Sequence, residues 1–453
     1  MTDADLIARY DGRVPRYTSY PTAPHFTPAT GAQAYAGWLE NLPVGVPVSL
    51  YLHVPFCDRL CLYCGCNTSV VHMERPKRIY ARTLMREIAL VAQTVGRRLQ
   101  VSHVHWGGGT PTVLPPDYLT DIMESLRGHF ELLPDAEIAI EIDPTSLAPD
   151  RLAALAQMGI NRVSLGVQDF DQAVQDAIGR QQSFEETAAC AQALRGIGIN
   201  SLNLDLIYGL PHQSEESLER TARQALALRA DRVAVFGYAH VPWMKKHQSL
   251  IPEASLPGAQ ARFAQAKMVR RVLEREGGYI PVGLDHFARP GDAMAEAALG
   301  RKLHRSFQGY TTDAAPVLIG LGASAIGSLP QGYVQNAPGV PAYSAAINEG
   351  RLAASRGAAL SPDDRLRRAV IESIMCELEV DLLAQAGAFG ADPAPLLADA
   401  QVLAGFQADG LVSWDGVRIE VTETGRPFVR NIAAVFDRYL TLQTATPRHA
   451  VAV

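Results

Sequence analysis

The chain has little cysteine, little net charge and no long hydrophobic run. Its 453 residues include only six cysteines, too few for a disulfide scaffold of this size. The formal net charge of −6 gives no general attraction to nucleic acid or anionic lipid. No stretch approaches about 18 uninterrupted apolar residues, and the first residues lack a basic segment followed by an apolar one. We therefore expect a cytoplasmic protein without a membrane span or a nucleic-acid partner.

The composition is that of a folded globular protein. Apolar residues make up 47% of the chain and charged residues 19%, which excludes disorder as its main state. At this length, about two to four domains are expected.

Six segments have the alternating pattern of β-strands. In Val48–Val54, apolar residues alternate with Ser49, Tyr51 and His53. Helix-like stretches separate the segments, and repeated βα units predict a parallel α/β fold. The other five segments are Val101–Trp106, Glu137–Asp143, Arg162–Gln168, Leu202–Tyr208 and Arg232–Tyr238.

The two faces of these strands differ in chemistry. One face is rich in Ile, Val and Leu, whereas the other carries Glu141, Gln168, Asn203 and Asp205. An open sheet covered on both sides by helices would be apolar on both faces. Polar residues near the carboxyl ends instead favour a partial, TIM-like (β/α)6 barrel with its active site at that rim. The alternative is that the polar faces are only solvated.

The segments around the barrel differ from it in character. Residues 1–47 predict an N-terminal extension that covers the barrel, and residues 48–330 the barrel with its own extension. Residues 361–453 predict a small, mainly helical, winged-helix-like domain. There Ser361 can cap a helix over Arg365–Cys376, and a hairpin can turn at Asp415-Gly416. In an acidic chain, this domain is better interpreted as a lid or scaffold than as a DNA-binding module.

Four cysteines fall within ten residues, directly after the first strand. Cys57, Cys61 and Cys64 have C-x3-C-x2-C spacing, and Cys66 follows two residues later. Thiolates select zinc, copper or iron–sulfur clusters. A structural zinc site normally uses two distant pairs of ligands, whereas three compact thiolates leave one coordination position open, as catalytic metal sites do.

This spacing, with the aromatic Tyr63 before the third cysteine, resembles the signature of the radical S-adenosylmethionine (SAM) enzymes. Further motifs resemble one family among them, the oxygen-independent coproporphyrinogen III oxidases, and the resemblance covers nearly the whole chain. These motifs are Pro15–Thr22, Tyr51–Cys57, Cys66 after Cys64-Gly, Trp106–Thr112, Leu206–Pro211, Asp285–Pro290 and Phe307–Thr312.

The resemblance implies the cofactors and the residues that hold them. Cys57, Cys61 and Cys64 would bind a [4Fe–4S] cluster, with SAM on its open iron. Contacts to this SAM would come from Tyr51, Gly108, Glu141, Ala239 and Ile326. A second SAM would contact Tyr63, Gly109, Thr110, Gln168, Arg180 and Asp205. Singly, each of these residues could equally have a structural role.

The resemblance also implies the reaction. It is the anaerobic oxidative decarboxylation of the ring A and B propionates of coproporphyrinogen III to vinyls, which gives protoporphyrinogen IX in haem biosynthesis. An electron from the reduced cluster would cleave SAM to a 5′-deoxyadenosyl radical, which takes a hydrogen from the propionate. The implied partners are a tetrapyrrole substrate and an unidentified electron donor and acceptor, with the chain a monomer.

Two other functions are weighed against this one. A haem chaperone would keep the cluster and SAM without oxidase activity, but such relatives typically lack the equivalents of Cys66 and the N-terminal Tyr17–Tyr20 segment. A zinc-stabilised scaffold could use the same four cysteines.

Several residues have open or minor roles. Cys66 is a tentative catalytic residue, because spacing does not say whether it binds, donates hydrogen or packs. Cys190 and Cys376 are expected to be buried apolar groups, and His103 and His105 barrel or rim residues. The substrate carboxylates need cationic or hydroxyl anchors, for which the candidates are Arg16, Tyr17, Tyr20, Arg289, His304, Arg305 and Tyr310.

Overall fold

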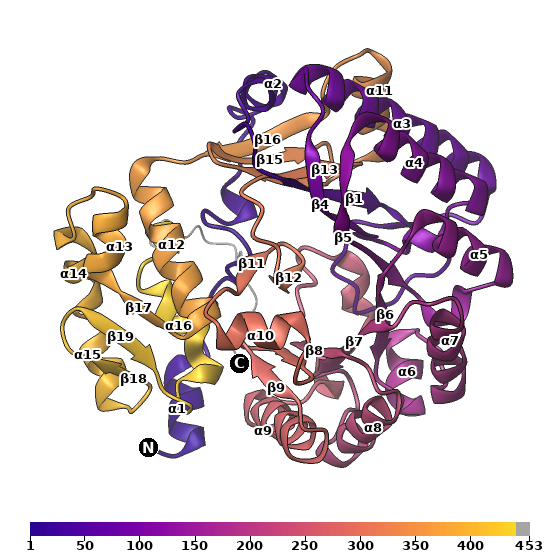
Figure 1. Cartoon of the computed structure of the whole chain (residues 1–453). Coiled ribbons are helices and arrows are strands. Elements are labelled where there is room, and N and C mark those ends of the chain that lie inside the picture. The colour runs from indigo at the N-terminus through magenta and orange to yellow at the C-terminus, as the bar shows by residue number, and fades with distance from the viewer. Residues whose placement is uncertain (441–453) are drawn as a thin grey trace.

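One large sheet dominates the computed structural model, which describes residues 1–440 (Figure 1). Its twelve strands have the order β16-β15-β14-β13-β1-β4-β5-β6-β7-β8-β10-β9. Six consecutive strands of this order, β1 to β8, run parallel. They are β1 (Val48–Val54), β4 (Gln100–Gly108), β5 (Glu131–Ile142), β6 (Arg162–Gln168), β7 (Ser201–Tyr208) and β8 (Arg232–Gly237). The six predicted strands are therefore confirmed.

Helices follow these strands and form an outer layer around the curved sheet (Figure 1). Apolar strand residues such as Leu165, Leu204 and Val233 face this layer and have no exposed surface. The polar residues of alternate positions face the inside, as in a barrel. The helices are α3 (Glu74–Val95), α4 (Pro116–His129), α5 (Pro149–Met158), α6 (Gln172–Ile178), α7 (Phe184–Gly196), α8 (Glu215–Ala227) and α9 (Ala259–Arg271). The partial barrel predicted from the two strand faces is confirmed.

The sheet continues beyond the six parallel strands on both sides. Next to β1, β13 (Leu318–Leu321) runs parallel to it, and Gly320 is paired with Tyr51. The sheet then ends in antiparallel strands β14 (Ile326–Leu329), β15 (Gly332–Asn336) and β16 (Ala354–Ala359). At the other edge lie β10 (His286–Ala288) and β9 (Ile280–Val282). Sequence alternation did not predict β13 to β16.

The C-terminal domain combines helices with a three-stranded sheet (Figure 1). Ser361 caps α12 through a hydrogen bond from Asp364 N, and Asp364 completes a capping box. The predicted hairpin is also present, since Asp415-Gly416 lies between two paired strands. The elements are α12 (Pro362–Glu377), β17 (Glu379–Asp381), α13 (Leu382–Ala388), α14 (Ala394–Ala400), α15 (Leu403–Ala408), β18 (Val412–Trp414), β19 (Arg418–Val421) and α16 (Val429–Ala434).

Residues 1–47 pack in two places. Leu6, Ile7 and Tyr10, from α1 (Asp3–Tyr10), belong to the same apolar cluster as Phe428 in the C-terminal domain. The following helix α2 (Ala32–Glu40) instead packs on the core of the large sheet through Tyr35 and Leu39. The segment therefore runs from one domain to the other.

Short elements complete the described chain. None of the helices in residues 1–440 is long and apolar enough to cross a membrane. Further short elements include β2 (Phe56–Cys57), β3 (Ser69–Val70), the 3-10 helix η4 (Lys246–Leu250), α10 (Ala293–Leu299), β11 (His304–Ser306), β12 (Gly309–Thr311) and α11 (Val340–Asn348).

Candidate functional site

The cysteine loop leaves the carboxyl end of β1 and borders a cavity at that end of the barrel. The cavity has a volume of about 800 Å³ and is lined by Cys57, Cys61, Cys64 and Cys66. Among residues 1–440, no three His, Cys, Asp or Glu side chains converge closely enough to hold one metal ion. The suitability of these cysteines for a metal group therefore depends on the chemistry of their thiols.

Two of the thiols have polar neighbours from other segments. Cys57 Sγ lies 3.1 Å from Thr68 Oγ1 and 3.7 Å from Thr110 Oγ1. Burial nevertheless raises the pKa of Cys57. Arg180 donates from Nη1 to Cys61 Sγ at 3.5 Å. A guanidinium beside a sulfur stabilises negative charge on it, which suits a thiolate ligand.

Cys64 and Cys66 interact with each other. The backbone N–H of Cys66 donates to Cys64 Sγ at 3.4 Å. A hydrogen bond from the Cys66 side chain lowers the pKa of Cys64 to about 6, and the same bond raises the pKa of Cys66 well above its usual value. Cys64 is therefore prepared as a thiolate at neutral pH while Cys66 keeps its proton. Three thiols from one loop, one of them readily ionised, fit the soft-ligand chemistry of an iron–sulfur cluster.

Three donors from one segment hold the backbone of the cysteine loop. Lys245 Nζ donates to the carbonyl of Cys66 at 2.8 Å, and Gln248 Nε2 donates to that of Tyr63 at 2.8 Å. His247 Nε2 lies 2.7 Å from the carbonyl of Cys64. We call Lys245, His247 and Gln248 the loop clamp. Sequence reasoning missed it, because its only signal was a run of polar side chains in a loop after β8.

The glycine run after β4 has a steric reason. Gly108 has φ +112°, and a Cβ there would lie 2.6 Å from the His53 ring. A Cβ on Gly109 would lie 2.4 Å from the carbonyl oxygen of Phe56. Only glycine lets this backbone pass close to the cysteine loop while its other side lines the cavity.

Polar side chains of the barrel interior face the same cavity. Asp205 accepts from Ser164 Oγ at 2.9 Å and from Asn203 Nδ2 at 2.8 Å. Burial raises the pKa of Asp205 to about 6. Glu141 accepts from the backbone N–H of Gly108 at 3.3 Å. Two carboxylates with remaining acceptor capacity thus lie opposite the cysteine loop.

Arg180 connects this wall to the cysteines. Its guanidinium donates to the carbonyl of Gly166 at 2.7 Å and lies 3.5 Å from Asp143 Oδ2. Its Nε is buried without a hydrogen-bond partner within the described residues. Gln168, which lies beside this arginine, has φ +66°, a strained value for a residue with a side chain.

The fold brings most of the predicted site residues into this one cavity. The residues that line it are Cys57, Cys61, Tyr63, Cys64, Cys66, Gly108, Gly109, Thr110, Glu141, Gln168, Arg180 and Asp205. Tyr51 lies behind it, where its hydroxyl is 3.0 Å from His53 Nδ1. Ile326 lies at the start of β14, with its backbone packed on Gly320, the strand partner of Tyr51. Ala239 lines a second cavity.

The second cavity has a volume of about 720 Å³ and lies between the barrel and the C-terminal domain. Arg16 and Arg305, two of the predicted substrate anchors, line it. Arg289 lines neither of these two cavities, and its guanidinium lies 5.8 Å from the centre of the Tyr279 ring. Arg289 lies away from both cavities because β10 ends beside the amino end of β8.

The remaining predicted anchors have protein partners. The Tyr17 hydroxyl donates to Asp437 at 3.1 Å, and His304 lies 3.3 Å from Glu372. Tyr310 donates to the carbonyl of Met375. Tyr20 and His304 line a third cavity of about 270 Å³.

The two cysteines outside the cysteine loop and two histidines of β4 lie as the sequence predicts. Cys190 and Cys376 are buried, and His103 and His105 contact the acids Asp313 and Glu141 inside the barrel.

Comparison with known proteins agrees with this geometry. The model of the radical SAM superfamily matches residues 51–225, and that of the HemN C-terminal domain matches residues 360–428. The chain is 52% identical to the oxygen-independent coproporphyrinogen III oxidase of Bradyrhizobium diazoefficiens over 96% of its length and 97% of the relative. The Escherichia coli oxidase is 41% identical, over 97% and 95% of the two chains.

A solved structure extends the similarity to the whole fold. The coproporphyrinogen III oxidase of Escherichia coli, HemN, described as a radical SAM enzyme, matches with a TM-score of 0.89 and 39% identity. The match covers 97% of this chain and 99% of the other. Membership of the radical SAM superfamily implies a [4Fe–4S] cluster and SAM as cofactors. The chain belongs to the oxygen-independent coproporphyrinogen III oxidase family of radical SAM enzymes.

Proposed function

We propose that this chain catalyses the anaerobic oxidative decarboxylation of the ring A and ring B propionates of coproporphyrinogen III, giving protoporphyrinogen IX. The observation that carries the proposal is the single cavity that joins the three cysteines to the polar inner wall of the barrel. The chain that forms this cavity also matches curated oxidases over nearly its full length, which supports the same reaction.

The residues of this chain would have distinct tasks. Cys57, Cys61 and Cys64 would hold the cluster, and Arg180 would stabilise charge on Cys61. When bound, the cluster and SAM supply a carbon radical that can remove a hydrogen atom from an unactivated carbon. The enclosed barrel interior would keep water and oxygen from that carbon.

The two predicted sets of SAM contacts are supported by different observations, the first by the positions of its residues on the strands and the second by a shared cavity. The predicted contacts to the SAM on the cluster lie in β1, β4, β5 and β14 and just after β8, and they are Tyr51, Gly108, Glu141, Ile326 and Ala239. The second set lines the cavity that contains the cysteines: Tyr63, Gly109, Thr110, Gln168, Arg180 and Asp205. A volume of about 800 Å³ supports more than one ligand, so we propose two SAM molecules.

Cys66 is proposed as a catalytic thiol rather than a cluster ligand. It keeps its proton beside Cys64, and its side chain is exposed at the cavity. The Cys66→Ser variant should therefore retain its iron while losing turnover. Loss of iron from this variant would instead make Cys66 a ligand.

The whole-protein properties are also proposals. We propose a cytoplasmic monomer that receives electrons from a separate donor and passes substrate electrons to a separate acceptor. The haem-chaperone alternative is not favoured, since the curated relatives that match along the whole chain are oxidases.

The test is an anaerobic incubation of reconstituted protein with a reductant, SAM and coproporphyrinogen III. We expect 5′-deoxyadenosine and, after oxidation, protoporphyrin in the mass spectrum, and neither product from Cys61→Ser. SAM cleavage with all four propionates intact would reject the proposed substrate. One zinc per chain, without acid-labile sulfide, would reject the cluster.

A further inference from the structure

Two of the family motifs contribute no residue to the cavity that contains the cysteines, here called the cysteine cavity, and these motifs meet at one histidine. They are Asp285–Pro290 and Phe307–Thr312. His286 of the first motif lies on β10, and Gly309 and Tyr310 of the second lie on β12. The centres of the His286 and Tyr310 rings are 5.3 Å apart, and the two rings are nearly perpendicular. His286 is therefore held between the large sheet and the β11–β12 hairpin.

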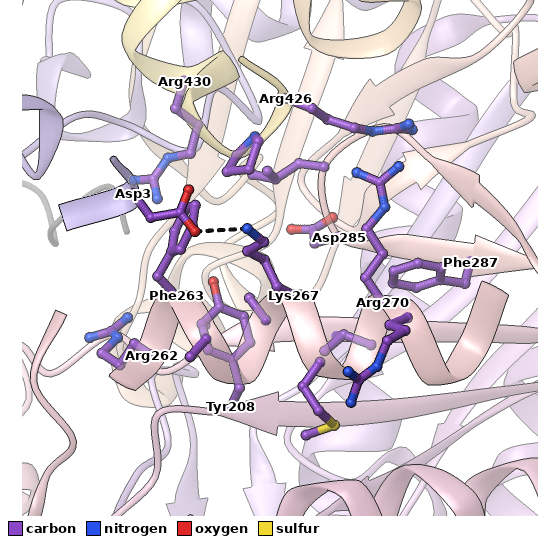
Figure 2. A pocket seen from close by; sticks show the side chains of 18 of the residues that line it. Asp3, Tyr208, Arg262, Phe263, Lys267, Arg270, Asp285, Phe287, Arg426 and Arg430 are labelled. Atoms are coloured by element: carbon purple, nitrogen blue, oxygen red, sulfur yellow. Dashed lines mark hydrogen bonds and ion pairs between the residues drawn. The ribbon is translucent and has the colours of Figure 1, made fainter. Parts of the chain in front are cut away.

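His286 faces the interior of the barrel. It is paired with Ala234 of β8, and Ala234 is paired with Asp205 of β7. Residues opposite one another in neighbouring strands point to the same face of a sheet, and Asp205 lines the cysteine cavity. The next residue of β10, Phe287, points the other way and lines the cavity between the barrel and the C-terminal domain, as Figure 2 shows. His286 and Asp205 thus belong to one inner row, with only the methyl group of Ala234 between them.

Only one of the two ring nitrogens of His286 has a hydrogen-bond partner within residues 1–440. Nδ1 lies 2.8 Å from Oδ1 of Asp285. Burial opposes ionisation of Asp285, but His286, Arg305 and Arg16 together lower the pKa of Asp285 to about 2. Asp285 is therefore a carboxylate at neutral pH, which only accepts hydrogen bonds, so Nδ1 is the nitrogen that carries the proton. In the neutral ring, Nε2 then holds a lone pair without a donor.

The surroundings of Nε2 are tight but leave it unpaired. His286 is only 7% exposed, and its ring also packs edge-on against Phe236, with the ring centres 5.5 Å apart. Gly309 has φ +111°, and a Cβ there would lie 3.2 Å from Nε2. Glycine at this position thus keeps the space beside Nε2 free of a side chain. A buried polar atom without a partner is rare in folded proteins, and a ligand that supplies a donor would satisfy it.

The proposed substrate has such a donor. A tetrapyrrole carries two kinds of polar group, namely carboxylates, which accept hydrogen bonds at neutral pH, and pyrrole N–H groups, which donate them. The lone pair on Nε2 matches a pyrrole N–H and does not match a carboxylate. His286 lies two strand spacings, or about 10 Å, from Asp205 along the inner row. A tetrapyrrole is large enough to contact His286 and still reach the cysteine cavity.

We infer that Nε2 of His286 accepts a hydrogen bond from a pyrrole N–H of the substrate, and that Asp285 is the positioning residue that fixes the ring for this contact. The inference rests on the proposed function, because the pyrrole is one of coproporphyrinogen III. We call His286 and Asp285 the inner dyad.

The same contact would act on the reaction itself. The propionate radical loses carbon dioxide and one electron and becomes the vinyl group, and the electron passes to the separate one-electron acceptor. As the electron leaves, the attached pyrrole becomes electron-poor and its N–H a stronger donor. A fixed acceptor at that N–H stabilises the developing positive charge.

Equilibrium dialysis of coproporphyrinogen III against the anaerobically reconstituted protein, without SAM, measures binding in the absence of turnover. His286→Phe keeps a ring but removes both nitrogens, and it should bind at least about fivefold more weakly. His286→Gln, whose amide can accept, should recover part of the affinity, whereas His286→Lys, which only donates, should not. Asp285→Asn should weaken binding less than His286→Phe does. Iron content and SAM affinity should match those of the unsubstituted protein in all four variants.

His129→Phe is the matched control, because His129 lies on α4 in the outer layer, with Nδ1 2.8 Å from the carbonyl of Ser125. It should leave the affinity unchanged. Recovery by His286→Lys rather than His286→Gln would assign the contact to a carboxylate and overturn the inference. Affinity within about twofold in His286→Phe, or no binding by the unsubstituted protein, would overturn it too. Loss of iron and SAM affinity together with substrate affinity would make His286 a structural residue instead.

Turnover separates this inference from the proposed function. At saturating substrate, His286→Phe should still form 5′-deoxyadenosine but yield less vinyl product per SAM cleaved. Protein that binds coproporphyrinogen III through His286 but never decarboxylates it would retain the contact and lose the oxidase assignment. Protein whose kcat and KM are the same with and without His286 would retain the oxidase assignment and lose the contact.

Discussion

At some positions of the cysteine cavity, the atoms around the Cβ position decide which residue types can fit. Gly108 combines φ +112° with the close His53 ring, so any side chain there must displace either the glycine run or His53. His53 in turn contacts the Tyr51 hydroxyl and the carbonyl of Asn67. A change at Gly108 would therefore move the wall of the proposed SAM site without touching a cysteine.

The Gly108→Ala variant should bind SAM at least about tenfold more weakly, because a strained backbone and a displaced ring each cost on the order of 1–3 kcal/mol. Its iron content after reconstitution should match that of the unsubstituted chain. Equilibrium binding of SAM and iron analysis measure the two effects. Gly128→Ala, in α4, is the control, since a Cβ there meets no atom within 4 Å. Unchanged SAM affinity in Gly108→Ala would contradict the steric argument.

At the scale of elements, the cysteine loop depends on a segment far away in sequence. The loop clamp belongs to the stretch around η4, and Gln248 both accepts from Val241 N–H at 2.6 Å and donates to the Tyr63 carbonyl. The side chain of Gln248 is buried. Losing both bonds leaves two backbone groups without partners.

We expect Gln248→Leu to lose iron to a chelator several-fold faster than the unsubstituted protein, since unpaired buried groups cost about 1–3 kcal/mol each and loosen the loop. Hydrogen exchange of the metal-free chain should also rise across residues 61–66. Ser249→Ala, on the exposed neighbour, should change neither. Equal chelation rates and equal exchange would show that the clamp does not order the loop.

A second dependence between elements involves a buried acid in α3. Glu87 accepts from Gly322 N–H at 2.6 Å, from Asn336 Nδ2 at 2.6 Å and from the Tyr343 hydroxyl at 2.7 Å. It joins α3 to the loop after β13, to β15 and to α11. Burial raises the pKa of Glu87 to about 7.

This raised pKa predicts a pH dependence of stability. Between about pH 4.5, the usual pKa of a glutamate, and about pH 7, Glu87 is protonated more fully in the folded chain than in the unfolded one. The contribution of Glu87 to the free energy of unfolding therefore falls as the pH rises through this window. Glu87→Gln should flatten the decline in the unfolding midpoint across that window. Glu74→Gln, on the exposed start of the same helix, is the control. Parallel pH profiles for Glu87→Gln and the unsubstituted chain would refute the assignment.

At the scale of the whole molecule, the two ends of the described chain share one core. Leu6 and Ile7 of α1 pack with Phe428 and other apolar residues of the C-terminal domain. Tyr10 donates to Asp409, and Arg430 donates to the carbonyl of Pro15. The N-terminal segment thereby places Arg16 at the cavity between the barrel and the C-terminal domain, so this cavity needs both ends of the described chain.

Leu6→Ala should destabilise this joint core by about 2–5 kcal/mol, the usual cost of a cavity at a fully buried leucine. Hydrogen exchange should increase in the C-terminal domain, across residues 396–436, more than in the barrel. Val44→Ala is the control, because Val44 is 82% exposed. An increase confined to residues 1–20 would mean that the C-terminal domain folds without α1.

The sequence by itself determined the local features. Alternation along β1 and β4 to β8 depends on the two-residue period of a strand, and C-x3-C-x2-C spacing depends only on neighbours in one loop. The parallel barrel and the cysteine cavity could therefore be predicted, as could the inward direction of Glu141 and Asp205. The family motifs added residues that periodicity does not distinguish, such as Gly109 and Arg180.

Only the tertiary structure decided which distant segments meet. β13 to β16 are short and interrupted by glycines, so their alternation is weak, and they are strands because the edge at β1 offers partners. The sequence offers Arg289 and Arg305 as equivalent candidate anchors for the substrate. However, Arg289 follows β10 and lies over the Tyr279 ring, whereas Arg305 in β11 lines the cavity between the barrel and the C-terminal domain. The loop clamp and the cavity between the barrel and the C-terminal domain arise the same way, since contacts across long stretches of chain leave no periodic trace in the sequence.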